Sequence, residues 1–596
     1  MSLMQQAYDT YGYAEKDRAG VYYAEENEPL APIGHTITKA AIEITIDGDG
    51  SFLQANAVAK DDEKTIFPVT EDSAGRTSKP VAHPLCDQLQ YLLPQYKDKN
   101  KLYVDQLSRW NDSAFKHPIT DAVLRYVTGG TIKDDLEMAG LLTYDNDGKL
   151  KNEKDFVRWI VTDIGDDSGP CWKNRKLQNC YSAWYQSIQE QVLDVCMVSG
   201  ERTIRAKQHA KGVVSLKGNA KLISANDSSG FTYRGRFLDD TEAANVSYEI
   251  SQKLHNALRW VIANQGVYYG GRCFVCWNPQ GKEIPRVQNA ITRRRGKPVA
   301  PVYTPTAYRE QIRSALNSWT SELPKDAKAV TAVFDAATTG RLALTYYSEL
   351  EAADFAARLA WWDETCCWPN GDFGIQPPTL SNIATFAFGT LRTDSFEADE
   401  NIMKQVMVQL LTSRVEKGPI PTAFARNLVQ KSGNLQIVPD DKEHKYLRRT
   451  LLFTTCAVIR KYHIDHYKEE WSMALEPEKR DRSYQFGRLM AIMEKIERDT
   501  YDADDKRETN IIRRQMAFVA RPYATTASVQ SHLKNAYYPQ LSVTARNYYE
   551  KLIEEIMEIL SEDGANLNRP LEDTYLLGYY LQKKELYTSR KEKVEE

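Results

Sequence analysis

The chain has 596 residues, of which 42% are apolar and 10% aromatic, enough for a large core and more than one domain. Its 31 glycines and 24 prolines, and the absence of a long uncharged apolar run, exclude collagen, wholesale disorder and a membrane-spanning helix. With 77 basic and 81 acidic residues the net charge is −4, so any contact with nucleic acid must come from local basic patches.

The residue pattern in the first third of the chain is typical of an α+β fold. Ile42, Ile44 and Ile46 alternate with polar residues, a turn signal follows at 47–50, and Phe52 begins a second run. This pattern predicts a β-hairpin. The turn also carries the Asp-x-Asp-Gly start of a calcium loop, but no glutamate stands at the closing position, so a plain turn is favoured.

The cysteines and histidines do not predict a metal site. Cys273 and Cys276 have ligand spacing, but a zinc site needs further ligands, and residues 272–277 have the pattern of a buried strand. His463 and His466 could be ligands on one helix, although surface histidines are favoured. Unpaired cysteines and the lack of a secretion signal predict a protein of the reducing cytoplasm.

Two basic loop systems are expected in the N-terminal part. Residues 199–239 are rich in glycine, lysine and arginine, and residues 293–298 read Arg-Arg-Arg-Gly-Lys-Pro. Long loops in compact proteins are usually either functional or disordered. A helix is expected at 241–264, and two strands at 329–347 about a turn at 338–340.

From about residue 350 the pattern becomes mostly helical. Apolar residues recur at helical spacing at 486–496 and 549–560, which predicts a C-terminal helical bundle. The expected fold is therefore an α+β N-terminal region with antiparallel strands and long basic loops, followed by a mostly helical region that ends in this bundle. Trp260, Trp361 and Trp362 are expected in the core.

The motifs of common catalytic chemistry are missing. The sequence has no GxxxxGK[ST] phosphate loop, no GxSxG nucleophile elbow and no HExxH zinc motif. Carboxylate pairs are abundant in so charged a chain and indicate nothing alone. The residues therefore predict a large non-catalytic binding protein without a cofactor or metal.

Several short runs, spread in order over most of the chain, carry a resemblance. They are TIFPVTEDSAGRTS (65–78), HPLCDQL (83–89), GFTYRGRF (230–237), KLHNALRW (253–260), GRLA (340–343), WW (361–362), GRL (487–489) and LLGYY (576–580). Together they resemble the large subunit (Cas-eight-c) of the type I-C CRISPR Cascade, an RNA-guided surveillance complex.

The resemblance implies a subunit rather than an enzyme. Such a subunit sits where the complex holds the 5′ handle of the guide RNA, and it reads the PAM, the short motif beside the target, in duplex DNA. It helps to open the duplex, holds the displaced strand and receives a separate helicase–nuclease. The implied partners are the guide RNA, the backbone, handle-binding and small subunits of Cascade, and target double-stranded DNA, with no membrane.

The resemblance also implies three parts of the chain. Residues 1–348 would recognise the PAM and DNA, 349–472 would form a helical connection, and 473–596 would form a bundle similar to the small Cascade subunit. In type I-C systems this last part is also made separately by internal translation, and Met473 is the start that we predict.

Short loops that combine polar and basic side chains suit PAM reading, because side chains must reach base edges while phosphate contacts set the register. A glycine also lets the backbone approach a groove closely. The candidates are Arg76, Thr77, Ser78, Lys79, Lys207, Lys211, Lys217, Gly218 and Asn219. For 76–78 the alternative of a turn that caps the next helix stays open.

Holding a displaced strand needs positive charge and aromatic stacking. The candidates are Arg234, Arg236, Arg293, Arg294, Arg295 and Lys297 in the loops, and Arg513, Arg514, Arg521, Lys534 and Arg546 in the C-terminal bundle. The alternatives are a solvated basic loop for the first set and ordinary pairing with neighbouring acids for the second.

Two other functions stay open at this point. One is a nuclease or guide-RNA-processing enzyme, whose cleavage would depend on His209 or His255. The other is a scaffold that makes no direct contact with DNA.

Overall fold

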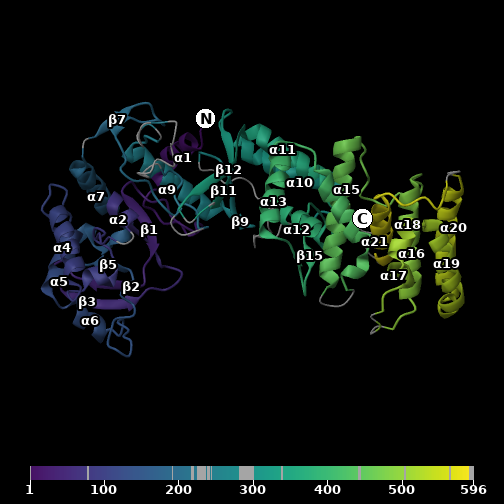
Figure 1. The fold of residues 1–596 in the computed structure, drawn as a ribbon, viewed down its shortest axis with the longest axis horizontal. Coiled ribbons are helices and arrows are strands. Elements are labelled where there is room, and N and C mark those ends of the chain that lie inside the picture. The colour runs from purple at the N-terminus through teal and green to yellow at the C-terminus, as the bar shows by residue number, and fades with distance from the viewer. Residues whose placement is uncertain are drawn as a thin grey trace. The chain divides into compact units, whose positions relative to one another are not determined.

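The computed structural model divides into two compact units (Figure 1). Unit 1 comprises Met1–Ile284 and Ala327–Leu350, and unit 2 comprises Pro285–Asp326 and Glu351–Glu596. The residues that the structure describes are 2–76, 79–190, 192–216, 220–224, 237, 242, 244–280, 301–336, 338, 340–439, 444–502, 505, 507–562 and 566–588.

The first sheet of unit 1 contains the predicted hairpin. β2 (Ile42–Ile46) pairs antiparallel with β3 (Phe52–Ala57), and the Asp47 carboxylate accepts hydrogen bonds from two backbone amides of the turn. β2 also pairs in parallel with β5 (Val157–Val161), and β6 (Gly169–Pro170) completes the order β3-β2-β5-β6. The hairpin prediction is confirmed, whereas the parallel pairing joins segments more than a hundred residues apart in the sequence.

Parallel neighbours need a long crossover, and here the crossover contains most of the helices of unit 1. These helices pack on the sheet around a core that includes the buried rings of Trp110, Trp159 and Tyr181. The other elements of this part are α1 (Leu3–Arg18), β1 (His35–Lys39), β4 (Lys64–Pro68), α2 (Glu71–Gly75), α3 (Leu89–Leu92), α4 (Lys97–Asn111), α5 (Pro118–Gly129), α6 (Ile132–Met138), α7 (Arg175–Ile188), β7 (Leu193–Val195) and β8 (Arg202–Ile204).

A second sheet of unit 1 has the order β12-β11-β10-β9. Its strand β10 (Arg272–Trp277) holds Cys273, which is buried, and Cys276, as the sequence predicts. The two strands expected about the turn at 338–340 are β11 and β12. The remaining bounds are β9 (Val267–Tyr269), β11 (Lys328–Ala336) and β12 (Leu342–Glu351).

The helix expected at 241–264 is α9 (Tyr248–Gln265), which packs against α1. It begins later than predicted because the Ser247 hydroxyl accepts a hydrogen bond from the Ile250 amide and thereby caps the first turn. Trp260 on this helix is buried, as predicted.

Unit 2 is mostly helical, as the sequence predicts. Trp362 is buried, but Trp361 is only half-buried, so its predicted core position is wrong in part. No helix in the described part of the chain is long and apolar enough to cross a membrane. The elements before the C-terminal helices are α10 (Pro305–Ser321), α11 (Ala352–Thr365), β13 (Trp368–Pro369), β14 (Ile375–Gln376), α12 (Leu380–Phe388), β15 (Thr390–Leu391), β16 (Phe396–Glu397), α13 (Glu400–Val415), α14 (Thr422–Ser432) and α15 (Lys445–Tyr467).

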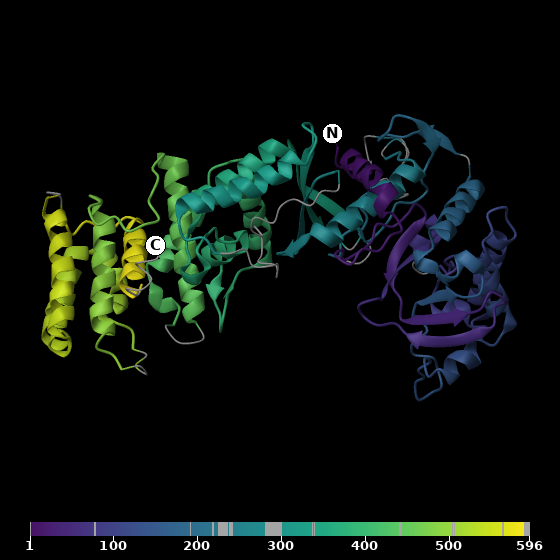
Figure 2. The ribbon, with the colours of Figure 1, turned by 180° about the vertical axis from the view of Figure 1, so that it is seen from behind.

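The C-terminal helices pack around one close helix pair. α16 (Arg482–Arg498) lies against α21 (Tyr575–Tyr587), and both views show them side by side (Figure 2). Gly487 and Gly578 make this approach possible, because each lies against the backbone of the opposite helix. The other helices here are α17 (Asn510–Arg513), α18 (Gln515–Ala520), α19 (Pro522–Ala536) and α20 (Val543–Glu562).

Candidate nucleic-acid interface

The base of one predicted basic loop is described in unit 1, and we call residues 207–221 the basic loop. Its two ends lie together, since the Gly212 amide donates to the Ala220 carbonyl at 3.1 Å. Lys221 then joins the edge of the second sheet through hydrogen bonds with Gly340 and Leu342, at 3.1 and 3.0 Å. The candidates Lys217, Gly218 and Asn219 lie outside the described residues, between these two ends.

Side chains from α2 and α9 hold the base of the basic loop in place. The Glu71 carboxylate accepts hydrogen bonds from the backbone amides of Lys207 and Gln208, at 2.8 and 3.1 Å. The Arg259 guanidinium donates to the Lys211 carbonyl at 3.1 Å. The loop therefore starts from a rigid platform even though few of its own residues are apolar.

The charges at this platform are unbalanced. Burial lowers the pKa of Lys211, and the charges of Lys221 and Arg76 lower it further. Burial also lowers the pKa of Lys221. Neither ammonium group forms an ion pair with a carboxylate among the described residues. The nearby carboxylates are engaged elsewhere, since Glu71 bonds to backbone amides of the loop and Asp87 to Arg76. Half-buried ammonium groups without a direct acidic partner are costly to the folded protein and mark a candidate site for an anion.

The same cluster affects nearby histidines. Burial and then the charges of Arg76 and Lys211 lower the pKa of His83 well below its usual value. Burial, followed by the charges of His255 and Lys221, lowers the pKa of His209 to about 3. These imidazoles are neutral at pH 7, so they add no charge to the platform.

Arg76, a PAM candidate, has a structural task in this conformation. Its guanidinium forms two hydrogen bonds with the buried Asp87 carboxylate, at 2.6 and 2.9 Å, and a third with the Val81 carbonyl. Asp87 also accepts from the His83 amide at 2.6 Å, so the pair closes the turn after α2. Of the alternative, a turn at 76–78 that caps the next helix, the structure describes only Arg76, since Thr77 and Ser78 lie outside the described residues and α3 begins after Gln88 with no side-chain cap. Base reading by Arg76 stays a prediction.

The remaining candidates of unit 1 differ in their surroundings. The Lys207 ammonium lies 3.0 Å from the Glu190 carboxylate, and Lys79 is exposed. Lys221 and Arg259 were missed as site residues. Their role depends on contacts with residues far away in the sequence, which a local sequence pattern does not indicate. Besides Lys217, Gly218 and Asn219, the candidates of both units that lie outside the described residues are Thr77, Ser78, Arg234, Arg236, Arg293, Arg294, Arg295 and Lys297.

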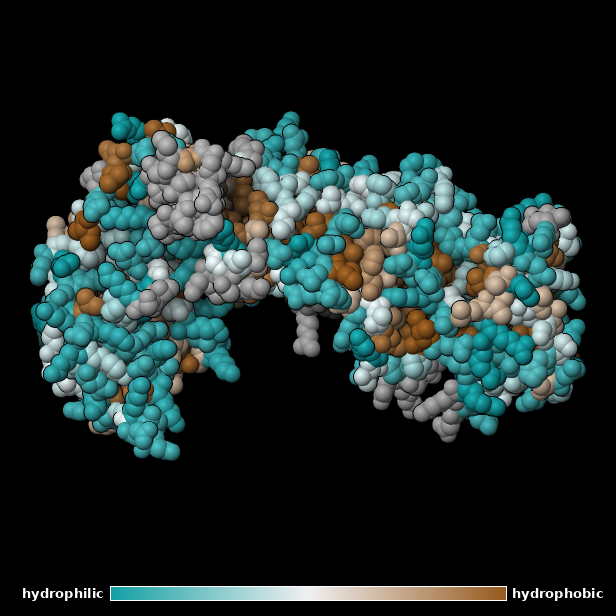
Figure 3. All heavy atoms as spheres, viewed as in Figure 1, coloured by the Kyte–Doolittle hydropathy of each residue, from teal (hydrophilic) through white to brown (hydrophobic). Residues whose placement is uncertain are grey.

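The C-terminal candidates of unit 2 share one property, which is that none forms an ion pair with a described carboxylate. Their side chains instead meet neutral groups: Arg513 donates to Asn510, Arg514 to Ser528 and Arg546 to the Tyr538 carbonyl. Four of the five, all except Arg546, are exposed, and the face drawn in Figure 3 is largely hydrophilic over α19 and α20. We call Arg513, Arg514, Arg521, Lys534 and Arg546 the unpaired cations.

Other cations of the same helices are paired with acids. Arg480 lies 3.2 Å from Glu562, and Lys551 lies 3.8 Å from Glu555. The sequence left open the alternative that basic residues of the bundle simply pair with neighbouring acids. This holds for Arg480 and Lys551, but no described carboxylate pairs with any of the five unpaired cations. Exposed positive charge without acids is what a phosphate backbone would contact.

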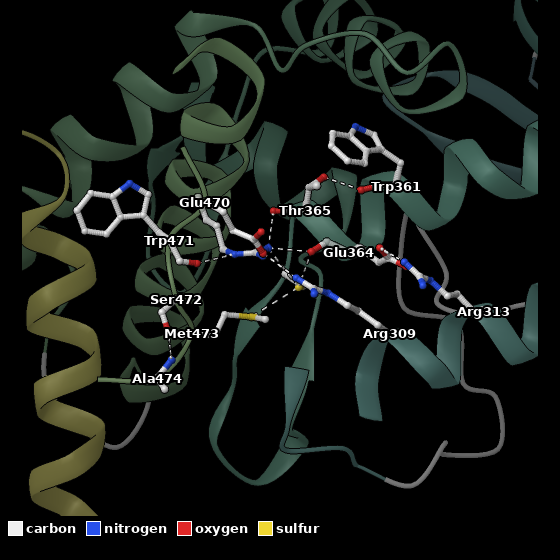
Figure 4. Close-up of polar contacts among 12 residues, drawn as sticks. Arg309, Arg313, Trp361, Glu364, Thr365, Glu470, Trp471, Ser472, Met473 and Ala474 are labelled. Carbon is white, nitrogen blue, oxygen red and sulfur yellow. Dashed lines mark hydrogen bonds and ion pairs between the residues drawn. The ribbon is translucent and has the colours of Figure 1, made fainter. Parts of the chain in front are cut away.

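Met473, the predicted internal start, lies between α15 and α16 with its sulfur 3.7 Å from that of Cys367. Figure 4 shows the segment that leads to it, with Glu470 near Glu364 and Thr365 of α11 and the indole of Trp471 pointing away from them. The buried Arg460 guanidinium joins the two segments by donating to the carbonyls of Glu364, Thr365 and Trp471. The use of Met473 as a start stays a prediction.

His463 is buried rather than at the surface, so the prediction of a surface position is wrong for it. Its two ring nitrogens lie 3.0 Å from the carboxylates of Glu469 and Asp573. Burial opposes the charged imidazolium, but the hydrogen bonds and charges of Asp573 and Glu469 outweigh it and raise the pKa above 6.5. The imidazolium therefore joins α15 to the start of α21.

This raised pKa predicts a pH-dependent stability. The contribution of the imidazolium is complete below the unfolded-state pKa and is lost as pH rises through the higher folded-state pKa. The difference in melting temperature between the wild type and His463→Gln should thus be largest at pH 6 and should shrink by pH 8.5. Thermal unfolding across this range measures it, and a difference that does not change with pH would contradict the assignment.

One known protein family matches nearly the whole chain. A family model described as "CRISPR-associated protein (Cas_Csd1)" matches residues 8–587. No curated protein matches the chain.

Proposed function

The chain belongs to the Cas_Csd1 family of CRISPR-associated proteins, and from this premise we propose that it is the non-catalytic large subunit of a type I-C surveillance complex. In this proposal it recognises the PAM in duplex DNA, promotes strand opening, holds the displaced strand and recruits a helicase–nuclease in trans. Its partners are the guide RNA and the other subunits of the complex.

The unbalanced cluster at the base of the basic loop carries the proposal. Lys211 and Lys221 are half-buried, form no ion pair with a described carboxylate and have lowered pKa values. The Lys211 ammonium donates to the Arg76 carbonyl at 3.0 Å, and a DNA phosphate would offset the repulsion and desolvation that remain. In the sequence, the segment 217–219 lies between Lys211 and Lys221, so phosphate contacts of these lysines would set the register for base reading by that segment.

The unpaired cations support the second part of the proposal. They would follow the backbone of the displaced strand, while the paired cations around them keep their structural partners. The two surfaces belong to different units, which suits a protein that contacts both the duplex and the separated strand.

Neutralising the loop platform tests the proposal. The double variant Lys211→Gln and Lys221→Gln, in the assembled complex, should weaken target-duplex binding by about tenfold for each lost charge-assisted contact. The slope of log K against log salt should become shallower by about 1.8, since each phosphate contact contributes roughly 0.9. The melting temperature should stay the same or rise, because each removed charge has a lowered pKa in the folded protein.

A matched control is available on α9. Lys253 is balanced by Glu15 and Glu249, at 3.2 and 3.0 Å, and these acids raise its pKa against the effect of burial. Lys253→Gln should leave DNA affinity and salt slope unchanged and should lower stability slightly. If the double variant binds target DNA like the wild type at every salt concentration, the platform does not contact phosphate.

The alternative of a nuclease or guide-RNA-processing enzyme gains no support from the histidines that would serve it. His255 is buried, and its ring bonds to the Ser251 carbonyl at 2.6 Å, while His209 bonds to the Ser251 hydroxyl at 2.8 Å. Both side chains pack the basic loop against α9. Cleavage of a guide precursor that His209→Gln abolishes would revive this alternative.

A further inference from the structure

A pocket of unit 2 lies apart from both basic surfaces in the sequence. It has a volume of about 380 Å³ and opens between α10 and α11, beside the turn that follows α13. Ala356 and Ala360 of α11 and Leu316 of α10 line it, so small and apolar side chains leave room at its base. Trp361 and Lys417 also line it, and the half-buried indole contacts two ammonium groups, those of Lys417 at the pocket and of the buried Lys461 at 5.6 Å from the ring centre.

Lys417 occupies an unusual backbone position. Its φ of 57° is left-handed, and it follows the end of α13, where glycine is normally preferred because it has no Cβ. The Lys417 ammonium lies 5.0 Å from the centre of the Trp361 ring. A lysine at this position bears a conformational cost, and its side chain is directed to the pocket, which suggests that the ammonium has a use there.

Two polar groups complete the pocket. Asn317 of α10 contributes a side-chain amide that forms no hydrogen bond with the described residues, and it can both donate and accept. Arg313 is paired with Glu364 through two hydrogen bonds, at 2.9 and 3.2 Å, and both residues come from the helices that flank the pocket (Figure 4). Of the two basic residues that line the pocket, Arg313 pairs with Glu364, whereas Lys417 has no carboxylate partner among the described residues.

We propose that this pocket binds one unpaired nucleobase with its phosphate. The exposed Lys417 ammonium moves from the Trp361 ring to the phosphate, the base stacks on the part of the indole that this uncovers, and the Asn317 amide meets a base edge. The volume falls within the range of small-molecule sites and suits one nucleotide. An apolar helix of a partner protein would use the alanine floor but would leave the amide and the ammonium without partners.

This inference deepens the proposed function, since the base can come from a single strand held by the complex. A free mononucleotide has the same chemistry and is the other source. The two sources differ in one respect that can be measured, because a strand is held by further contacts along its backbone whereas a mononucleotide has only this pocket.

Photocrosslinking tests the inference. The assembled complex is irradiated with target DNA whose displaced strand carries 5-bromodeoxyuridine at successive positions, and adducts are mapped by mass spectrometry. We expect an adduct on the peptide that contains Trp361 from one or a few adjacent positions. Lys417→Gly should lower its yield about tenfold, and glycine suits the left-handed backbone there, so the fold should be kept.

Lys468→Gly is the matched control. Lys468 is also a lysine with left-handed φ, 61°, at the end of a helix, but its ammonium bonds to the Asp465 carbonyl and does not line the pocket. Its adduct yield should equal that of the wild type. Excess 5-bromodeoxyuridine monophosphate that forms the same adduct without DNA, and competes with the strand, would identify a free nucleotide as the source.

Three results would overturn the inference, and the first two concern the adducts. One is normal binding of target DNA with no adduct on the Trp361 peptide from any position, which would leave the proposed function intact. The other is an equal adduct yield in Lys417→Gly and Lys468→Gly. Loss of subunit assembly in Lys417→Gly alone would instead identify a protein partner in the pocket and would also overturn it. Failure of the wild-type complex to bind target DNA would count against the proposed function itself.

Discussion

Replacing four of the unpaired cations with glutamine is expected to release the displaced strand from the assembled complex. The changes are Arg513→Gln, Arg514→Gln, Arg521→Gln and Lys534→Gln, all at exposed positions without described acidic partners. The affinity for a single strand should fall by at least about 100-fold, and the salt slope should become shallower by about 2.8, because each phosphate contact to a single strand contributes roughly 0.7. Filter binding at several salt concentrations measures both quantities.

The control for this variant removes the same amount of charge from the same C-terminal part of the chain. It replaces four cations that pair with acids, through Arg480→Gln, Lys495→Gln, Lys551→Gln and Arg569→Gln. These cations already have partners, so affinity and slope should change little. If both quadruple variants weaken binding equally, the effect comes from net charge alone, and the unpaired cations form no track for the strand.

Adding one methyl group at the α16–α21 contact is expected to unfold the C-terminal helices. A Cβ on Gly487 would lie 1.9 Å from the Tyr575 carbonyl oxygen, and a Cβ on Gly578 would lie 2.1 Å from that of Tyr484. Both obstacles are backbone atoms that cannot turn aside, so the helices must separate and lose their packing. Gly487→Ala should cost about 3 kcal/mol or more, which is at the upper end of overpacking effects.

Urea unfolding and limited proteolysis measure this loss, and cleavage should begin in the C-terminal helices. Gly12→Ala is the control, since Gly12 lies within α1 and a Cβ there would meet nothing within 4 Å. That change should stabilise α1 by up to about 1 kcal/mol, because alanine favours helix more than glycine does. Equal stabilities of the two variants would refute the close-contact account.

The glycine contact also explains part of the family resemblance physically. The runs GRL (487–489) and LLGYY (576–580) lie far apart in the sequence, yet each supplies one of the two glycines of the contact. Neighbouring polar residues add to it: the Arg488 guanidinium bonds to the Gln582 side chain at 2.9 Å, and the Tyr579 hydroxyl bonds to the Glu494 carboxylate at 2.6 Å. These runs therefore preserve the approach of two helices.

Local patterns predicted much of the secondary structure correctly. The hairpin of β2 and β3, the strand β10 and the helical C-terminal half follow from periodicity and turn residues, which act over a few positions. The start of α9 was placed too early, because the cap that begins it is a single serine. The parallel pairing of β2 with β5 was not foreseen, since no local signal indicates which distant strand becomes a neighbour.

The candidate site was only partly predictable for the same reason. The sequence drew attention to Lys211 as one of many basic loop residues, but it could not show that Lys221 lies near it or that no described carboxylate pairs with either ammonium group. It placed His463 at the surface because a lone histidine carries no sign of its partners, although two carboxylates from separate segments enclose it. Trp361 was assigned to the core, whereas its ring lines a pocket.

By itself the sequence determined the order of an α+β part and a helical part, the absence of familiar catalytic motifs, and a family resemblance that the Cas_Csd1 match bears out at the level of the family. Only the tertiary structure decided which cations have acidic partners. Arg76 is bound to Asp87, while among the described residues Arg514 bonds to the Ser528 hydroxyl and to no carboxylate. The physical reason is that periodicity depends on neighbours in the chain, whereas the partner of a charge depends on which distant segments folding brings within a few ångströms.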